Sequence, residues 1–166
     1  MADAPTDEEI RQWHRRFAVE ANNRAWRLSE AAARTAADDA EMLNAAHAAA
    51  MHWSKVGTDL HAARAAMLLG HVHALLGHGD IAMRYASATF DYFTSHKCAD
   101  WELAFTHAVL ANAASAADDA RLHLDHFAIA KQMGEALADP EERKIFEATL
   151  CRIRQPSTGT DGAHQR

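Results

Sequence analysis

Cysteine is almost absent from this chain of 166 residues, which contains only Cys98 and Cys151. The two lie far apart and form no Cys-x-x-Cys motif, so we expect neither a disulfide framework nor a cysteine-ligated zinc site. A chain of this length buries about 70% of the surface that its unfolded form exposes, so its core needs no covalent links. The scarcity of cysteine predicts two free thiols in a reducing compartment.

Long apolar runs and an excess of basic residues are also missing. No stretch of about 18 apolar residues occurs, and the N-terminus lacks a basic region followed by an apolar segment, so we expect no membrane partner and no secretory signal. The formal net charge is -6, with acidic residues interspersed among basic ones. Nucleic-acid binding needs clustered Lys and Arg, so we expect no nucleic-acid partner. These absences predict a cytoplasmic protein.

The alternating apolar pattern of β-strands is absent as well, whereas apolar residues recur every three or four positions and helix-favouring residues abound. We therefore predict an all-α fold of seven helices, in which short connections make successive helices antiparallel. Thr6 and Glu9 match a capping box before the first helix, and Pro140 after Asp139 is typical of a helix start. The predicted helices span residues 7–33, 36–56, 58–77, 80–97, 100–116, 118–137 and 140–154.

One domain over residues 1–154 accounts for all seven helices, and residues 155–166 lose the apolar periodicity and are expected to form a flexible tail. Within the domain we predict an irregular N-terminal pair over 7–56, two repeat-like pairs over 58–97 and 100–137, and a capping helix over 140–154. The large aromatic residues of the first two helices are expected to form a core between them: Trp13, Phe17, Trp26 and Trp53.

The middle of the chain resembles a tetratricopeptide repeat in its spacing of large and small residues, as short bacterial proteins of this kind do. The residues that carry the resemblance are Ala66-x-x-Leu69-Gly70-x-x-His73 with Gly77, Ala82 and Ala86, and then Ala108, Ala120, Leu124 and Phe127. His73 and His107 stand where the family has an aromatic residue and a leucine, and no closing proline appears. The resemblance implies a right-handed solenoid in which small residues at Gly70, Ala82, Ala108 and Ala120 let the helices approach closely.

Such a repeat implies a groove lined by the first helix of each pair. It would hold Arg64, Met67, His71 and Leu75 from one pair, and Glu102, Phe105, Val109 and Asn112 from the next. Because arginine offers a bidentate fork to carboxylates, this groove suits a protein or peptide partner, or a small anionic ligand. In the alternative interpretation, Arg64 and His71 lie on a solvated face.

The twelve histidines raise the question of a metal, since imidazole is a common ligand of transition metals. Neither the Glu-x-x-His nor the His-Glu-x-x-His pattern occurs. A non-standard site could be assembled from His47, His52, His71 and His107. The helix over 36–56 is small or apolar on nearly every side, which predicts a central position with His47 and His52 buried. In the alternative interpretation the histidines bind no metal, and they lie on the surface or form hydrogen bonds with neighbouring polar groups.

Catalytic signatures are lacking, because the chain has no glycine-rich phosphate loop and no Gly-x-Ser-x-Gly motif. Cys98 follows Lys97, a setting that lowers a thiol pKa, but no general base is marked. We therefore predict no cofactor and a binding function without catalysis, in a monomer or weak homodimer. The alternative is a histidine-rich metal- or small-molecule-binding protein, with its site between the first three helices. The predicted site comprises Asn22, Trp26, His47, His52, Trp53, Arg64, Met67 and His71.

Overall fold

A computed structural model describes residues 4–156, which form seven helices and no strand, and this confirms the all-α prediction. The predicted tail lies mostly outside the described residues. The helices are α1 (Asp7–Ser29), α2 (Ala36–Val56), α3 (Asp59–Leu75), α4 (Gly79–Ser95), α5 (Asp100–Ala116), α6 (Ala120–Ala136) and α7 (Pro140–Leu150). The largest differences from the predicted bounds are at the ends of α1 and α7, each of which stops about one turn early.

Side-chain caps explain where several helices begin. The Thr6 backbone N–H donates to Glu9 Oε2 over 2.7 Å, and the Glu9 N–H donates back to Thr6 Oγ1 over 3.3 Å. Thr35 and Asp38 repeat this capping box before α2. Asp139 caps α7 just before the proline. Each cap satisfies backbone N–H groups that have no partner within the helix, so these boundaries could be predicted from the sequence.

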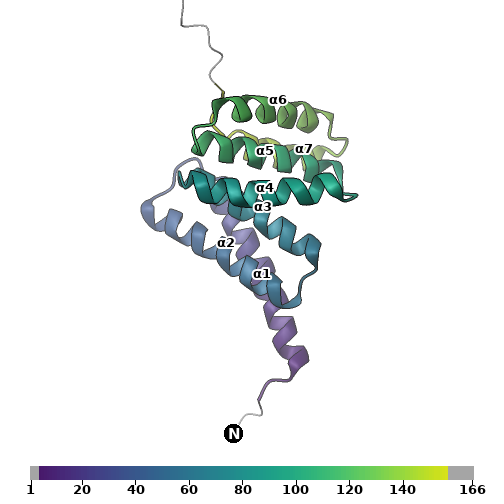
Figure 1. Cartoon of the computed structure of the whole chain (residues 1–166). Helices are drawn as coiled ribbons and strands as arrows, with labels where there is room; N and C mark the ends of the chain where they lie inside the picture. The colour runs from purple at the N-terminus through teal and green to yellow at the C-terminus, as the bar shows by residue number, and fades with distance from the viewer. Residues whose placement is uncertain (1–3, 157–166) are drawn as a thin grey trace, which may run out of the picture.

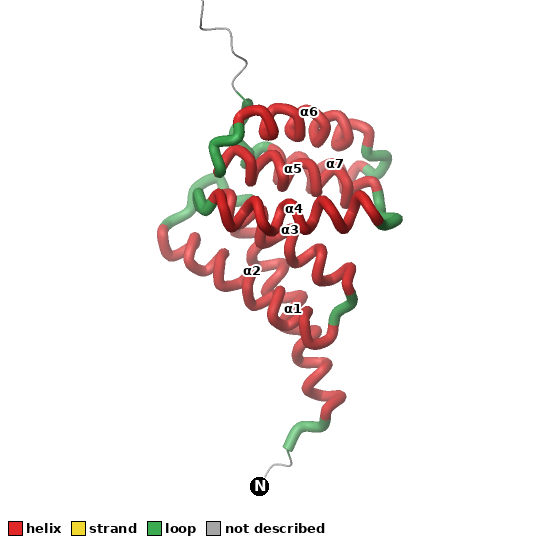
Figure 2. The backbone as a smooth tube through the Cα atoms, in the orientation of Figure 1, coloured by secondary structure: helices red, strands yellow, loops and turns green. Residues whose placement is uncertain are grey.

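The helices form hairpins joined by short loops (Figures 1 and 2). α1 packs on α2, α3 on α4 and α5 on α6, and the first members of these pairs also contact one another, α3 meeting both α1 and α5. The last helix, α7, packs on α5 and α6. Helices α1, α3, α5 and α7 thus line one side of the array. None of the described helices has the length and apolar content needed to cross a membrane.

Small residues allow α3, α4 and α5 to pack closely. A Cβ atom added at Gly70 would lie 3.0 Å from Val109 and 3.2 Å from the backbone nitrogen of Ala86. Ala82 and Ala108 are fully buried, as predicted. The prediction for Ala120 is wrong, because this residue is exposed. Ala120 is the first residue of α6 and lies at its exposed N-terminal end. The close contact of α6 occurs instead at Gly134, which lies against the Phe146 ring.

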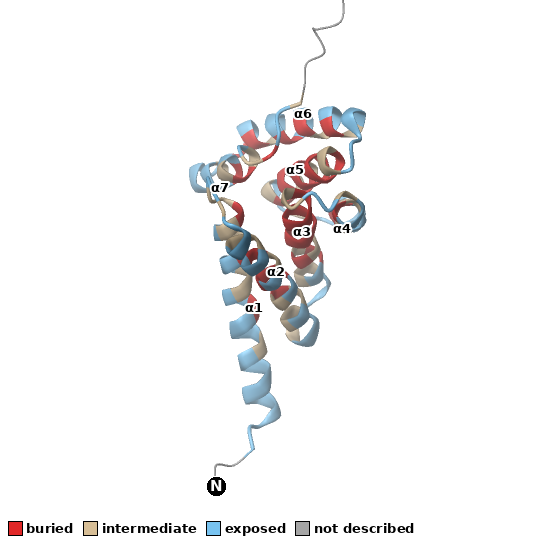
Figure 3. Cartoon of the chain, turned by 90° about the vertical axis from the view of Figure 1, so that its left-hand side faces the viewer, coloured by how far each residue is buried: buried red, intermediate tan, exposed pale blue. Residues whose placement is uncertain are grey.

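The predicted aromatic core of α1 is wrong for Trp13 and Phe17, whereas Trp26 does pack against the buried core. Trp13 and Phe17 are 50% and 52% exposed, while the buried residues of α1 are Ala18, Ala25 and Ser29. The small residues form the face that packs, since they let α1 approach its neighbours closely, and the large residues of its N-terminal half are left outside. In Figure 3 most of this half is exposed, and it extends beyond the other helices.

Helix α2 is peripheral, and its predicted central position is wrong. Met42, Ala45, Ala46 and Ala49 form its buried face, whereas His47 lies on the opposite, exposed face. Alanine tolerates solvent as well as a core, so the alanine-rich sequence carries little information about which face is buried. The helices buried on most sides are α3 and α5 (Figure 3).

Candidate functional site

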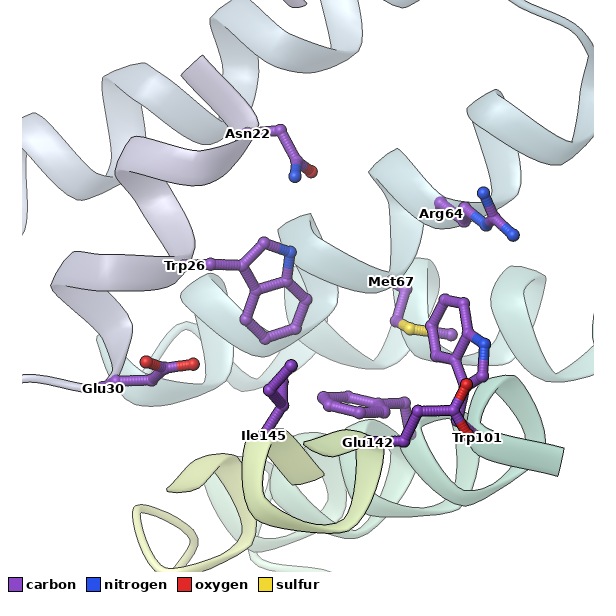
Figure 4. A pocket seen from close by; sticks show the side chains of 9 residues that line it. Asn22, Trp26, Glu30, Arg64, Met67, Trp101, Glu142 and Ile145 are labelled. Atoms are coloured by element: carbon purple, nitrogen blue, oxygen red, sulfur yellow. The ribbon is translucent and has the colours of Figure 1, made fainter. Parts of the chain in front are cut away.

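A cavity of about 460 Å³ opens between the four helices that line one side of the array. Pockets that hold organic ligands commonly have volumes of roughly 300–1,000 Å³, so this cavity has room for such a ligand. α1, α3, α5 and α7 all contribute side chains (Figure 4). The lining residues are Asn22, Trp26, Glu30, Arg64, Met67, Trp101, Phe105, Glu142 and Ile145.

Aromatic rings form much of the wall. The Trp26 and Phe105 rings meet edge to face with 5.7 Å between centroids, and the Trp101 and Phe105 rings do so at 6.0 Å. Trp26 lies near the middle of the cavity wall in Figure 4. Edge-to-face pairs of this kind hold each ring in a defined orientation. The wall therefore presents fixed aromatic surfaces to a ligand.

His71 supports Trp26 from the protein interior. The two rings stack with 5.4 Å between centroids, and His71 is completely buried. Its Nδ1 lies 3.1 Å from Asn112 Nδ2, and an amide N–H can only donate, so Nδ1 accepts and the ring proton lies on Nε2. Burial, assisted by the charge of Arg34, lowers the pKa of His71 to about 4. His71 is thus a neutral support behind the cavity wall.

The positive charge of Arg64 is already compensated. Its Nε and Nη2 both lie 2.8 Å from Oε1 of Glu102, a residue that is only 3% exposed. The second carboxylate oxygen of Glu102 accepts from the Ala99 N–H over 2.9 Å. The Arg64 guanidinium also lies 5.2 Å from the Trp101 ring centroid. Arg64 is therefore engaged by neighbouring side chains, which leaves less of its charge for an anionic ligand than the sequence suggested.

Two further carboxylates, Glu30 and Glu142, line the cavity and are half-buried. Among the ion pairs within residues 4–156, none includes either of them. Burial raises the pKa of Glu30, and the charge of Arg152 opposes this rise without cancelling it. The side chains that face the cavity thus carry more uncompensated negative than positive charge.

The structure brings together half of the residues in the predicted site. Asn22, Trp26, Arg64 and Met67 line the cavity. His71 lies behind Trp26 and supports it. The remaining three are on α2, which contributes no residue to the cavity: His47, His52 and Trp53. Trp53 instead packs against His61, with the two rings tilted by 31° and 4.3 Å between their centroids.

The four histidines considered as a metal set are separated. His52 pairs with His14, their Nδ1 atoms 2.8 Å apart, and the rings of His47 and His73 meet edge to face at 5.4 Å. His107 makes a similar 2.8 Å contact with His126, while His71 contacts Asn112. Within residues 4–156, no group of three or more His, Cys, Asp or Glu side chains is arranged to hold a metal ion. The structure therefore does not bring together the four histidines that the sequence offered as a possible ligand set.

These histidine pairs have consequences for protonation. Burial, followed by the nearby His126, lowers the pKa of His107 to about 4. Burial likewise lowers the pKa of His73 to about 4, with His47 and His78 contributing. In the His14–His52 and His107–His126 pairs, one Nδ1 donates and the other accepts, so protonation of both rings of a pair would break the contact. Acid should therefore weaken several interior contacts together.

Cys98 does not have the environment of an activated thiol. Burial raises the pKa of Cys98, and the charges of Glu102 and Asp100 raise it further. The expected lowering of the Cys98 pKa by Lys97 is therefore wrong. The Cys98 thiol donates to the Phe93 carbonyl over 3.4 Å, and both cysteines are free.

Sequence reasoning missed four residues of the cavity: Glu30, Trp101, Glu142 and Ile145. Trp101 could have been found, because it lies one helical turn before Phe105 on the same face of the first helix of its pair. The two α7 residues could not, since a helix regarded as a cap was not expected to face the groove. Glu30 is the C-cap residue of α1 and lay inside a helix predicted to continue.

Comparisons with protein-family models, curated proteins and solved structures find no match for this chain. The function must therefore be inferred from the cavity itself.

Proposed function

We propose that this protein is a tetratricopeptide-like binding module of the cytoplasm, which holds a ligand or a segment of a partner protein in the cavity between α1, α3, α5 and α7. The observation that carries the proposal is that four helices that do not follow one another along the chain all contribute side chains to one aromatic cavity. A cavity that served packing alone would be filled by side chains, because protein interiors are close-packed.

The surroundings of the cavity support the same proposal. Met67 and Phe105 are buried and form a fixed base, whereas Ile145 is 55% exposed at its edge. Concave sites for organic groups usually combine such apolar walls with a few polar groups that orient the ligand. Here Asn22 supplies an amide and Glu142 a carboxylate. No arrangement of nucleophile and base accompanies them within the described residues, so the proposal is one of binding.

A blocking substitution tests the proposal. A random peptide library and a library of small organic compounds would be screened against the wild-type protein, and the affinity of each hit measured by isothermal titration calorimetry. Asn22→Trp should fill part of the cavity and abolish binding of the hits. Asn44→Trp, the same change at an exposed position on α2, is the matched control and should leave affinity unchanged. Hits that bind both variants equally well would refute the cavity as the binding site.

A further inference from the structure

The charges that line the cavity are unequal in a way that favours one class of ligand. Arg64 is the one positively charged lining residue, and Glu102 neutralises it at 2.8 Å. Glu30 and Glu142 are without an ion-pair partner in residues 4–156. A negatively charged ligand would meet two carboxylates and an arginine whose charge is already compensated. A positively charged ligand would meet two free carboxylates.

The ends of the two helices that carry these carboxylates do not reverse the balance. Glu30 is the C-cap residue of α1, where the partial negative charge of the helix end adds to that of the carboxylate. Glu142 lies in the first turn of α7 together with Glu141. The partial positive charge of a helix N-terminus is roughly half a unit, so two carboxylates outweigh it. Arg152 lies close enough to Glu30 to affect its pKa, but it does not line the cavity.

The aromatic wall also favours a cation. Indole and phenyl faces carry negative partial charge and attract ammonium or guanidinium groups within about 6 Å of the ring centroid. The protein already places one cation in this way, since the Arg64 guanidinium lies 5.2 Å from the Trp101 ring. Trp26 and Phe105 line the remainder of the same wall. Figure 4 shows Glu30 on one side of Trp26, with Trp101 and Glu142 on the other.

The limited hydrogen-bonding capacity of the cavity favours a small molecule over an extended peptide. A peptide backbone presents a donor and an acceptor at nearly every residue, and each must be satisfied when it is buried. Asn22 is the one uncharged amide among the lining side chains, and Met67 and Ile145 are apolar. A compact ligand with one charged group and an apolar body has fewer donors and acceptors that must be satisfied by hydrogen bonds.

We propose that the cavity binds a small organic ammonium ion, with its charged group against Trp26 and its charge balanced by Glu30 and Glu142. This proposal rests on the proposed function, because it names the ligand class of the same cavity. The raised pKa of Glu30 agrees with it, since a bound cation would stabilise the ionised carboxylate. Affinity should therefore fall as the pH is lowered through the pKa of Glu30.

Two probes of equal shape and different charge test the ligand class. Choline carries a trimethylammonium group, and its neutral isostere is the alcohol in which a tert-butyl group replaces that group. Calorimetric titration of the wild-type protein should give at least about tenfold tighter binding of choline, because both the aromatic rings and the two carboxylates attract its positive charge. The double substitution Glu30→Gln and Glu142→Gln should weaken choline binding by about tenfold and leave the alcohol unaffected. Glu141→Gln, on the exposed side of the same turn, should change neither affinity.

The outcomes separate this inference from the proposed function. Equal affinity for choline and the alcohol, with both lost in Asn22→Trp, would overturn the ammonium class and leave the cavity as a binding site. Stronger binding of Nα-acetyl-lysine amide, whose side-chain ammonium group is free, than of choline would also overturn it, because the cation would then come from a protein side chain. If hits from the screened libraries bind Asn22→Trp as well as they bind the wild-type protein, the proposed function itself fails. A choline affinity that is unchanged in the double variant would refute the roles of Glu30 and Glu142.

Discussion

The two halves of this helical array bury their residues to very different extents. In α1, 3 of 23 residues are buried, whereas in α5 the number is 11 of 17. Both helices carry aromatic residues, although α5 has six alanines in 17 residues and α1 has three in 23. Their surroundings differ as well, because α5 packs against α3, α4, α6 and α7, while the N-terminal half of α1 extends beyond the array. Composition alone therefore does not tell which apolar residues stabilise the fold, and the cavity lies where the well-packed helices meet the C-terminal half of α1.

The largest effect should come from equivalent phenylalanine truncations in the two halves. Phe93 of α4 is 1% exposed and Phe17 of α1 is 52% exposed. Phe93→Ala should lower the free energy of unfolding by about 4 kcal/mol, because it leaves a cavity in the core. Phe17→Ala should change it by less than about 0.5 kcal/mol. Urea unfolding followed by circular dichroism measures both, and similar losses would mean that the N-terminal half of α1 is packed in solution.

Enlarging a small residue should come next. Gly70→Leu would push a side chain toward Val109 and the backbone of Ala86, and should cost about 3 kcal/mol. Ala120→Leu, at the exposed first residue of α6, should change stability by less than about 0.5 kcal/mol. The same urea experiment compares the two. If Ala120→Leu were strongly destabilised, Ala120 would have to lie in a close helix contact, as the sequence had indicated.

Acidification should lower the free energy of unfolding, because His71 is buried in its neutral form. Its pKa is about 4 in the folded protein, below the ordinary 6.5, so between these values the unfolded chain binds more protons. Stability therefore falls as the pH is lowered, and from about pH 7 to about pH 5 this residue should account for a loss of about 2 kcal/mol. His71→Gln should remove that part of the pH dependence. Val72→Ala, a change of the fully buried neighbour, should lower stability without altering its slope with pH. An unchanged slope in His71→Gln would contradict the assignment.

The smallest effect should come from two ion pairs. Arg64 pairs with Glu102, whose side chain is 4% exposed, whereas both partners of Arg24–Glu41 are nearly half exposed. Arg64→Ala should cost about 1 kcal/mol because it leaves a buried carboxylate without its partner. Arg24→Ala should cost less than about 0.5 kcal/mol, as is usual for a surface pair. Equal losses in thermal or urea unfolding would mean that the burial of Glu102 has no energetic consequence.

The elements of this fold could be predicted from the sequence because their signals are local. Thr6, Thr35 and Asp139 cap their helices through bonds that span three residues or fewer. Gly70 and Ala82 indicated a close helix approach through an equally local pattern. The burial of α1 and α2 could not be predicted in this way. Whether Trp13 meets a partner depends on how far the other helices reach, and the periodicity of one helix contains no such information.

The sequence predicted the residues of the candidate site that follow from their spacing along one helix. It missed the residues that reach the cavity only because distant segments pack together. Arg64 and Met67 follow from the spacing of the first helices, and both line the cavity. Glu142 and Ile145 face it because α7 folds back onto α5 and α6. The charge balance of the cavity could not be predicted either, since the pairing of Arg64 with Glu102 joins residues from different helices.

The four tryptophans allow the two halves to be compared in a single spectrum. Trp26 and Trp101 line the cavity, whereas Trp13 and Trp53 lie outside it. Their indole N–H groups give separate signals in a two-dimensional proton–nitrogen NMR spectrum, which would be recorded during titration with choline. We predict that the signals of Trp26 and Trp101 shift together and saturate, while those of Trp13 and Trp53 stay in place. Shifts confined to Trp13 and Trp53 would contradict a binding site between α1, α3, α5 and α7.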